Sequence, residues 1–264
     1  LELASLPALP RWIDEPLPDF RGYADVTEKK AAFFSYLYSR TVLVNSRILL
    51  QRQHLLDLKN QDVLTEEDTA WLAAQAERLR GDEEPGSDEM FDKLLRRLDT
   101  IPPSLVLAQA ANESAWGTSR FARQGNNLFG QWCFSPGCGL VPLGRPEGAN
   151  YEVARFRSTY HSVRAYVQNL NRHPAYHELR VLREQAHQNG GYPTGSELAA
   201  GLVEAHGRAG GGVHQQPRAS VQEHQIAGAG LAVVQLRAAA AEDLDPHAVV
   251  AAEGGRVVVG FLGP

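Results

Sequence analysis

Apolar residues recur at three- and four-residue spacing over much of the first hundred positions, which is the pattern of helices with one buried face. The spacing predicts a long helix over about 27–59. Thr65, followed by three acidic residues, predicts the capped start of a second helix, and a third is expected over about 88–98. We therefore expect an N-terminal helical region over 25–98, preceded by an extended, proline-rich linker over 1–24.

The pattern changes twice in the second half of the chain. The prolines of 101–104 predict another helix start, and the strongly apolar run 105–115 should continue as a helix that Gly117 ends. Over 126–156 glycine and proline are frequent and the apolar spacing shortens, which predicts a small β lobe. Helical spacing resumes over 158–202. The fold is therefore expected to be mainly α, an α+β helical bundle with a small β-hairpin lobe flanking a cleft.

Composition and charge exclude several classes of protein. With 264 residues and 43% hydrophobic content, the chain is able to bury a substantial core. The net charge of -5 and the lack of a Lys/Arg-rich run argue against nucleic acid as a partner. The sequence contains no run of 18 apolar residues, so it predicts no transmembrane helix. The sequence contains no P-loop, no GxGxxG fingerprint and no GxSxG elbow, and no cofactor is expected.

The two cysteines, Cys133 and Cys138, enclose a Ser-Pro-Gly turn. Such a turn could bring the cysteines within disulfide range, so we favour a disulfide and an oxidising compartment. Free thiols are the alternative, and half a zinc site is disfavoured because zinc needs about four ligands. His173 and His177 stand four apart with a proline between them and no third ligand, so we expect no metal site. The start at Leu1, without Met, predicts a processed chain whose export signal was removed.

Glu113 is the candidate catalytic acid. It follows Ala110, Gln109 and Val106 by three, four and seven positions, so we expect it on a largely buried helical face. Burial and the negative end of the helix dipole both favour a neutral carboxyl group. Such a group can protonate the leaving oxygen of a glycosidic bond. A solvated surface glutamate without a catalytic role is the alternative.

The residues after Glu113 are of types that bind sugars. An indole can stack on a sugar face, carboxamides suit hydroxyl and N-acetyl groups, and Gly125 and Gly130 allow the backbone to approach a ligand. Ordinary core packing is the alternative for Trp116 and Phe129. The candidate substrate-binding residues are Ser114, Trp116, Asn126, Asn127, Phe129 and Gln131.

Two segments carry a family resemblance. The run Ala108-Gln109-Ala110-Ala111-Asn112-Glu113-Ser114-Ala115-Trp116-Gly117, taken with Gly125-Asn126-Asn127-Leu128-Phe129-Gly130, resembles the signature of glycoside hydrolase family 73. These enzymes are endo-β-N-acetylglucosaminidases that include peptidoglycan hydrolases. The resemblance is closest to the Bax-type bacterial branch, in which 131–134 and the second cysteine also fit, and it covers roughly 17–206.

The resemblance implies a lysozyme-like fold, with a catalytic domain over 99–206 and Glu113 as the invariant acid. It also implies that Tyr176 lies near the cleft, where it would hold substrate or reactive water. Glu147 and Glu152 are the candidates for a second carboxylate in the β lobe, although neither has the expected spacing. Two outcomes therefore stay open: inversion through a water held between two carboxyl groups, or retention with the N-acetyl group of the substrate as nucleophile.

The activity implied is cleavage of peptidoglycan glycan strands at N-acetylglucosamine, in the periplasm or cell envelope of a bacterium. One alternative is a muramidase or lytic transglycosylase on the same fold, because a single acid suffices for that chemistry. Another is a non-catalytic module that binds the cell wall.

The composition changes after His206, where glycine, alanine and valine runs show no helical face and the family resemblance ends. We interpret 207–264 as an atypical tail, either disordered or the product of a frameshift. Codons for 211–225 can be chosen so that reading them one nucleotide later gives an amphipathic helix, which resembles the further helix that the family expects.

Overall fold

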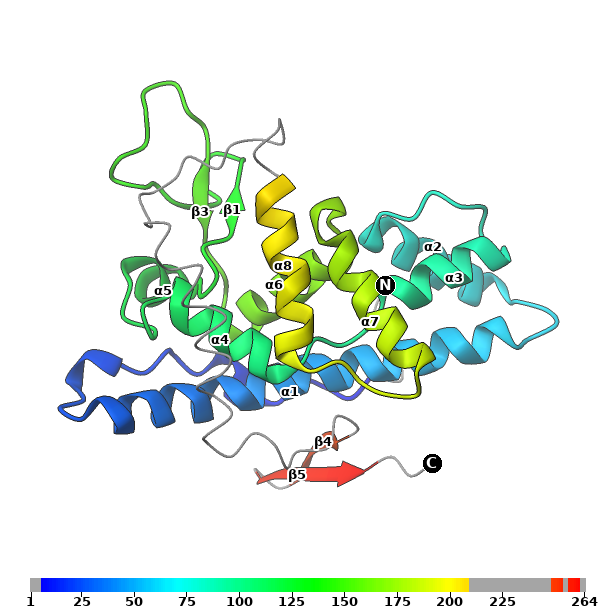
Figure 1. Ribbon diagram of the computed structural model, residues 1–264, viewed down its shortest axis with the longest axis horizontal. Coiled ribbons are helices and arrows are strands. Elements are labelled where there is room, and N and C mark those ends of the chain that lie inside the picture. The colour runs from blue at the N-terminus through cyan, green and yellow to red at the C-terminus, as the bar shows by residue number, and fades with distance from the viewer. Residues whose placement is uncertain (1–5, 209–247, 254–255, 262–264) are drawn as a thin grey trace.

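The computed structural model in Figure 1 describes residues 6–208, 248–253 and 256–261. This part of the chain is largely helical, with a small sheet at one end. The helices are α1 (Val26–Lys59), α2 (Glu66–Leu79), α3 (Asp88–Arg97), α4 (Pro103–Glu113), α5 (Arg120–Gly125), α6 (Thr159–Arg172), α7 (His177–Gln188) and α8 (Gly195–Arg208). The 3-10 helices are η1 (Arg11–Asp14), η2 (Phe20–Gly22) and η3 (Pro174–Tyr176), and the strands are β1 (Trp132–Cys133), β2 (Gly139–Leu140), β3 (Glu152–Ala154), β4 (Ala248–Glu253) and β5 (Arg256–Phe261).

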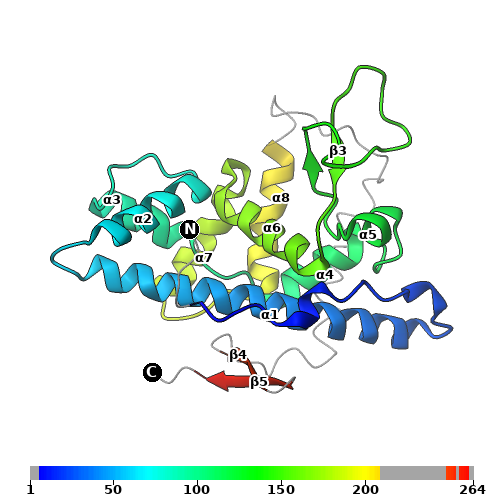
Figure 2. The same cartoon turned by 180° about the vertical axis from the view of Figure 1, so that it is seen from behind.

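The longest element, α1, has the bounds that the apolar spacing predicts. It runs along one side of the molecule beneath α4 and α6, as Figures 1 and 2 show from opposite sides. Asp25 caps its start by accepting a hydrogen bond from the Glu28 amide. Its buried face packs against α3, α4 and α6, so the N-terminal helical region and the rest of the molecule share one hydrophobic core.

The segment 11–22 differs from the extended linker expected. It forms η1 and η2, and it buries Ile13 and Phe20 in the core. The Phe20 side chain is only 1% exposed, and its ring meets that of Phe33 on α1 edge to face at 5.4 Å. The prolines of this segment suggested a linker, but its apolar side chains find a site on α1 that no local pattern could show.

The core centres on α4. Pro103 occupies its first turn, where a missing amide hydrogen has no cost. Leu105, Val106 and Ala110 are almost completely inaccessible to solvent, and the helix packs against α1 and α8. It ends at Glu113, two residues earlier than expected, because the chain then enters a left-handed turn.

The β lobe is a three-stranded antiparallel sheet in the order β1-β3-β2, and not the simple hairpin expected. Val153 pairs with Trp132 on one side and with Leu140 on the other. Because β1 and β2 are both antiparallel to the strand between them, they run in the same direction. Their connection, 134–138, must therefore cross β3.

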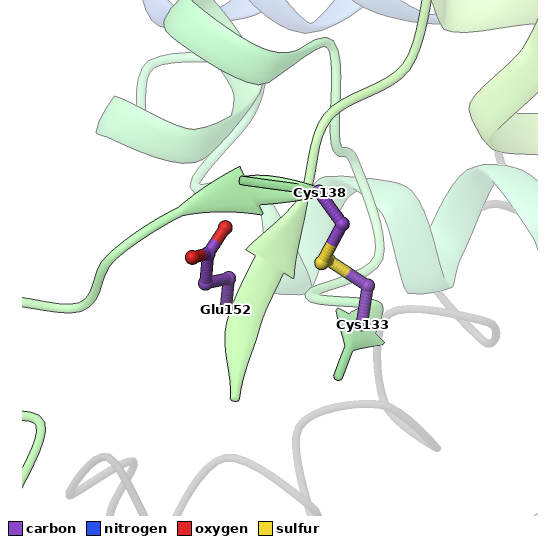
Figure 3. Close-up of side chains that lie close together, drawn as sticks. All are labelled: Cys133, Cys138 and Glu152. Atoms are coloured by element: carbon purple, nitrogen blue, oxygen red, sulfur yellow. A yellow bond between two sulfur atoms is a disulfide. The ribbon is translucent and has the colours of Figure 1, made fainter. Parts of the chain in front are cut away.

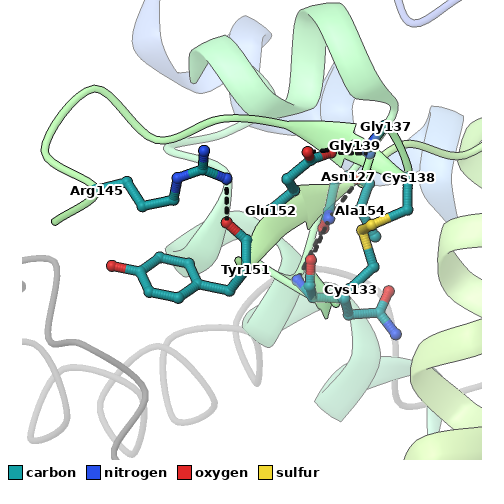
Figure 4. The surroundings of a disulfide bond; sticks show 10 residues. Asn127, Cys133, Gly137, Cys138, Gly139, Arg145, Tyr151, Glu152 and Ala154 are labelled. Carbon is teal, nitrogen blue, oxygen red and sulfur yellow. Dashed lines mark hydrogen bonds between the residues drawn. A yellow bond between two sulfur atoms is a disulfide. The ribbon is translucent and has the colours of Figure 1, made fainter. Parts of the chain in front are cut away.

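A disulfide and a buried carboxylate hold this crossover, as Figures 3 and 4 show. The bond between Cys133 and Cys138 confirms the predicted disulfide, and the two Cα atoms are 6.1 Å apart. The Glu152 carboxylate accepts hydrogen bonds from the amides of Gly137 at 3.0 Å and Gly139 at 2.8 Å. These amides hold the pKa of Glu152 below its usual value.

A buried ionic cluster ties the chain between α3 and α4 to α1 and α7. Asp99 lies 2.9 Å from Nε2 of His187, 3.6 Å from Nε of Arg183 and 3.7 Å from the guanidinium of Arg52. Burial alone would raise the pKa of Asp99, but the attraction of Arg183 and the contacts with His187 and Arg52 outweigh it and lower the pKa to about 2.

At the C-terminal end, α8 extends to Arg208, beyond the domain boundary expected at 206. The strands β4 and β5 form an antiparallel ribbon, and β4 lies against α1. The stretch 211–225, on which the frameshift hypothesis rests, is outside the described residues. None of the helices described here has the length and apolarity needed to cross a membrane.

We predict that Asp99→Asn lowers the free energy of unfolding near neutral pH by at least about 2 kcal/mol. The folded-state pKa, about 2, lies below the reference value of 3.8. The stabilisation is therefore complete above pH 3.8 and is lost as the pH falls through 2. Urea unfolding across this range measures the effect. Asp92→Asn, which removes an exposed partner of Lys59, is the control and should change little. A loss for Asp99→Asn no larger than the control's would contradict the prediction.

We predict that Glu152→Gln loosens the crossover. The amide side chain has only one acceptor oxygen, so Gly137 or Gly139 loses its partner. Faster exchange of those two amide protons and faster reduction of the disulfide by dithiothreitol are expected. Glu147→Gln, at an exposed position in the next loop, is the matched control. Equal exchange rates in the two variants would show that the carboxylate does not hold the crossover.

Candidate active site

The candidate acid, Glu113, ends α4 and faces the loop between α5 and β1. A Cβ atom placed on Gly130 would lie 3.8 Å from Oε2 of Glu113, so the backbone at Gly130 directly borders the carboxyl group. The side chain is exposed, and the expectation that it shares the burial of Val106 and Ala110 is wrong. Those two residues face helices, whereas the last turn of α4 extends past them to an open edge.

The chain leaves α4 through a left-handed turn. The amide of Trp116 donates to the carbonyl of Ala111 at 2.9 Å, and that of Ala115 donates to Asn112 at 3.4 Å, which is the Schellman pattern. Ala115, Trp116 and Gly117 have φ values of 50°, 60° and 75°. Glycine adopts such values freely, but for the other two residues they are unfavourable by about 1–2 kcal/mol each. The strained turn next to the acid therefore needs support from its surroundings.

Ser114 lies inside this turn and does not face a ligand site. Its side chain is buried, its hydroxyl donates to the carbonyl of Ala110 at 2.6 Å, and it accepts a bond from the Gly117 amide at 2.8 Å. A Cβ atom on Gly117 would stand 2.7 Å from the ring of Phe20. Ser114 and Gly117 therefore stabilise the turn. This arrangement does not support the expected contact of Ser114 with substrate.

Trp116 packs against α1. Its ring meets those of Phe33 and Phe34 edge to face at 5.7 and 5.2 Å, and Nζ of Lys30 lies 5.1 Å from its centroid. The ring is partly buried at the edge of the core. This is the core-packing alternative for Trp116, and it does not support stacking on a sugar.

The side-chain amides of Asn126 and Asn127 hydrogen-bond to backbone groups and stabilise the loop over 126–131. Asn127 is buried, and its Nδ2 donates to the carbonyl of Gln131 at 2.9 Å. It also donates to the carbonyl of Ala154 in β3 at 2.8 Å, as Figure 4 shows. Its Oδ1 accepts from the amides of Phe129 and Gln131. Asn126 has a left-handed backbone and donates to the carbonyls of residues 156 and 157. The side chains of Asn126 and Asn127 therefore fix the backbone that borders Glu113.

Phe129 and Gln131 dock this loop onto α6. The ring of Phe129 stacks on that of Tyr166 with centroids 4.0 Å apart and planes 3° from parallel. With its amide oriented to satisfy both partners, Gln131 donates to the carbonyl of Ser162 and accepts from the amide of Tyr166. Phe129 and Gln131, which were expected to bind sugar, are thus packed between the loop and α6.

Two tyrosines lie close enough to Glu113 for its charge to act on them. Burial raises the pKa of Tyr176, and the charge of Glu113 adds to the effect. Burial raises the pKa of Tyr166 well above its usual value, with Tyr176 and Glu113 contributing. Both tyrosines therefore stay neutral at ordinary pH. The resemblance implies that Tyr176 lies near the cleft, and the effect of Glu113 on its pKa is compatible with that position.

Tyr166 is the residue that sequence reasoning missed. It lies on the buried face of α6, where helical spacing predicts only core packing. Its hydroxyl group is buried, and no group in the described part of the chain hydrogen-bonds to it. A buried tyrosine usually finds a partner for its hydroxyl. The available signal was therefore the polar end of this side chain at a buried position of the helix.

The two candidates for a second carboxylate, Glu152 and Glu147, lie in the β lobe. Both oxygens of Glu152 accept amides of the crossover, and Glu147 is exposed in the loop between β2 and β3. No contact in the described part of the chain places either side chain against Glu113. The site described here therefore centres on one carboxyl group, the Gly130 backbone and two tyrosines.

The described residues offer no metal site. His173 accepts a hydrogen bond from the amide of Ala175 and caps η3. Among these residues, the clustered groups of a metal-ligating type are Glu152 and the two disulfide sulfurs, which are not thiolates.

Comparison with known proteins identifies the domain that carries this site. Residues 88–211 match the model of the glucosaminidase family, described as mannosyl-glycoprotein endo-beta-N-acetylglucosaminidase. The chain is 37% identical to the protein Bax of Escherichia coli (strain K12) over 170 residues, which are 64% of this chain and 60% of that protein. No solved structure gives a significant match. Residues 88–211, which hold the signature at Glu113, are thus similar to the glucosaminidase family, and a longer stretch of the chain is similar to Bax.

Proposed function

We propose that this protein is an endo-β-N-acetylglucosaminidase that hydrolyses the glycan strands of bacterial peptidoglycan, with Glu113 as the general acid. The observation that carries the proposal is the position of Glu113, which stands exposed at a helix end beside Gly130. Its charge also contributes to the raised pKa values of two neutral tyrosines. An exposed carboxyl group at an open edge is accessible to a polymer. The disulfide fits an oxidising compartment such as the bacterial periplasm.

In this mechanism Glu113 protonates the glycosidic oxygen as the sugar develops positive charge at its anomeric carbon. The exposed carboxyl group loses its water when the glycan covers the edge between α4 and Gly130. The loss of water favours the neutral acid in the complex, so the substrate itself supplies the burial that the free protein lacks.

The tyrosines supply neutral hydrogen bonds beside the acid. We propose that the hydroxyl of Tyr166, which is buried in the free protein, acquires its partner when substrate binding opens its surroundings, from either the N-acetyl group or a hydroxyl of the sugar. Tyr176, on η3, is close enough for the charge of Glu113 to act on it, and in this proposal it helps to hold the sugar. Because their pKa values are raised, both side chains act as hydrogen-bond donors without adding charge.

We propose that the N-acetyl group of the substrate acts as the nucleophile. Inversion needs a second carboxylate to activate water. Both oxygens of Glu152 already accept amides of the crossover, and Glu147 is exposed in a neighbouring loop. Substrate-assisted catalysis leaves the anomeric configuration retained, so NMR of the first product formed tests this step.

A muramidase or lytic transglycosylase would use the same acid on the neighbouring bond, and a wall-binding module would need no acid. The family match favours cleavage at N-acetylglucosamine. Borohydride reduction of the digested peptidoglycan separates these functions. The proposal requires reduced N-acetylglucosamine ends, a muramidase gives reduced muramic acid ends, and a transglycosylase gives anhydro ends.

We predict that Glu113→Gln lowers the rate of peptidoglycan cleavage by about 100-fold or more, because the amide cannot donate the proton to the leaving oxygen. The exposed position of the side chain means that the folded state should survive the change. Turbidity clearing and release of reducing ends measure the rate, and pull-down on insoluble peptidoglycan measures binding. Equal clearing by both proteins would remove Glu113 from the mechanism. Binding without clearing by either would favour the module.

We predict that Tyr166→Phe lowers the cleavage rate by about tenfold or more while leaving the protein as stable or more stable. The variant removes a buried hydroxyl for which the described residues offer no hydrogen-bond partner, an arrangement that is unfavourable in the folded state. Thermal unfolding and turbidity clearing are measured together. Tyr38→Phe, a partly buried tyrosine of α1, is the matched control and should leave the rate unchanged. An unchanged rate for Tyr166→Phe would exclude a role for its hydroxyl.

A further inference from the structure

We propose that Phe33 and Phe34 of α1, which lie outside the residues matched by the family model, support the catalytic site, and that Trp116 is the positioning residue through which they act on Glu113. The inference rests on the proposed role of Glu113 as the acid. Its direct basis is the packing of one aromatic cluster, Phe20, Phe33, Phe34 and Trp116, on the turn that follows the acid.

The last turn of α4 depends on the backbone of Trp116. Its amide closes the helix by donating to Ala111, two residues before the acid. Glu113 is therefore enclosed within the loop of chain that this hydrogen bond closes. Any change in the conformation of 115–117 shifts the end of α4, and with it the carboxyl group beside Gly130.

The turn does not hold this conformation by itself. Ala115 and Trp116 both have positive φ values, which side chains with a Cβ atom disfavour. A helix end of this kind normally carries glycine at the position of Ala115. The conformation therefore persists because contacts outside the turn stabilise it.

Those contacts come from the N-terminal elements. The Trp116 ring lies against Phe33 and Phe34 of α1, with Lys30 near its face. One residue on, the Gly117 backbone fits closely against Phe20, whose own ring packs on Phe33. Segments that precede the family domain in sequence therefore contact the turn at two successive residues, Trp116 and Gly117. A displacement of only about 1 Å at a catalytic group can lower a rate 100-fold.

The test compares two tryptophans in the full chain. Trp116→Leu removes the ring that meets α1, and Trp71→Leu removes a buried ring of α2 that packs on His54. Both variants should unfold at a lower temperature. Only Trp116→Leu should lower kcat, by about tenfold or more, with KM for soluble peptidoglycan fragments changed less than twofold. Trp116→Phe, which keeps a ring against Phe33 and Phe34, should recover most of kcat.

Phe34→Leu changes the α1 side of the same contact and covers the case in which Trp116→Leu does not fold. It should also lower kcat at constant KM. A kcat for Phe34→Leu and Trp116→Leu equal to that of the wild type, or a fall matched by Trp71→Leu, would overturn the inference. Glu113→Gln, measured alongside, separates the two proposals. Full activity of Glu113→Gln rejects Glu113 as the acid. An inactive Glu113→Gln together with a fully active Trp116→Leu rejects only the positioning role of Trp116.

Discussion

The left-handed turn after α4 is the constraint on which the arrangement of the site depends. Two residues with side chains adopt positive φ values there, so the turn needs support, and the aromatic rings of the N-terminal segment and α1 provide it. The same turn ends the helix at Glu113 and leaves its carboxyl group at an open edge. Position and accessibility of the acid thus have a common physical origin.

Around this acid, most polar side chains stabilise the backbone. Asn127 and Ser114 are buried, and both use their hydrogen bonds within the chain. Glu152 does the same at the crossover of the β lobe, where the disulfide adds a covalent link. This is expected where a loop must be rigid, because a buried polar group without a partner is unfavourable. Tyr166 is an exception in the described structure, which is why its hydroxyl group points to function.

The sequence by itself determined the helices and singled out Glu113 as the candidate acid. Helical spacing predicted the bounds of α1 almost to the residue, and the signature around Glu113 indicated the family whose model residues 88–211 match. The Ser-Pro-Gly turn between Cys133 and Cys138 correctly indicated the disulfide. These features are local, since spacing, capping and turn residues act within a few positions of each other.

Only the tertiary structure decided which side chains face the site. Glu113 extends a buried stripe, yet its side chain is exposed at the end of α4. Trp116 and the loop amides are of sugar-binding types, yet packing and hydrogen bonding assign them to the scaffold. The order β1-β3-β2 and the burial of Phe20 likewise depend on contacts between distant segments. A sequence pattern reports the preference of a residue, whereas its partners are set by elements that meet only when the chain folds.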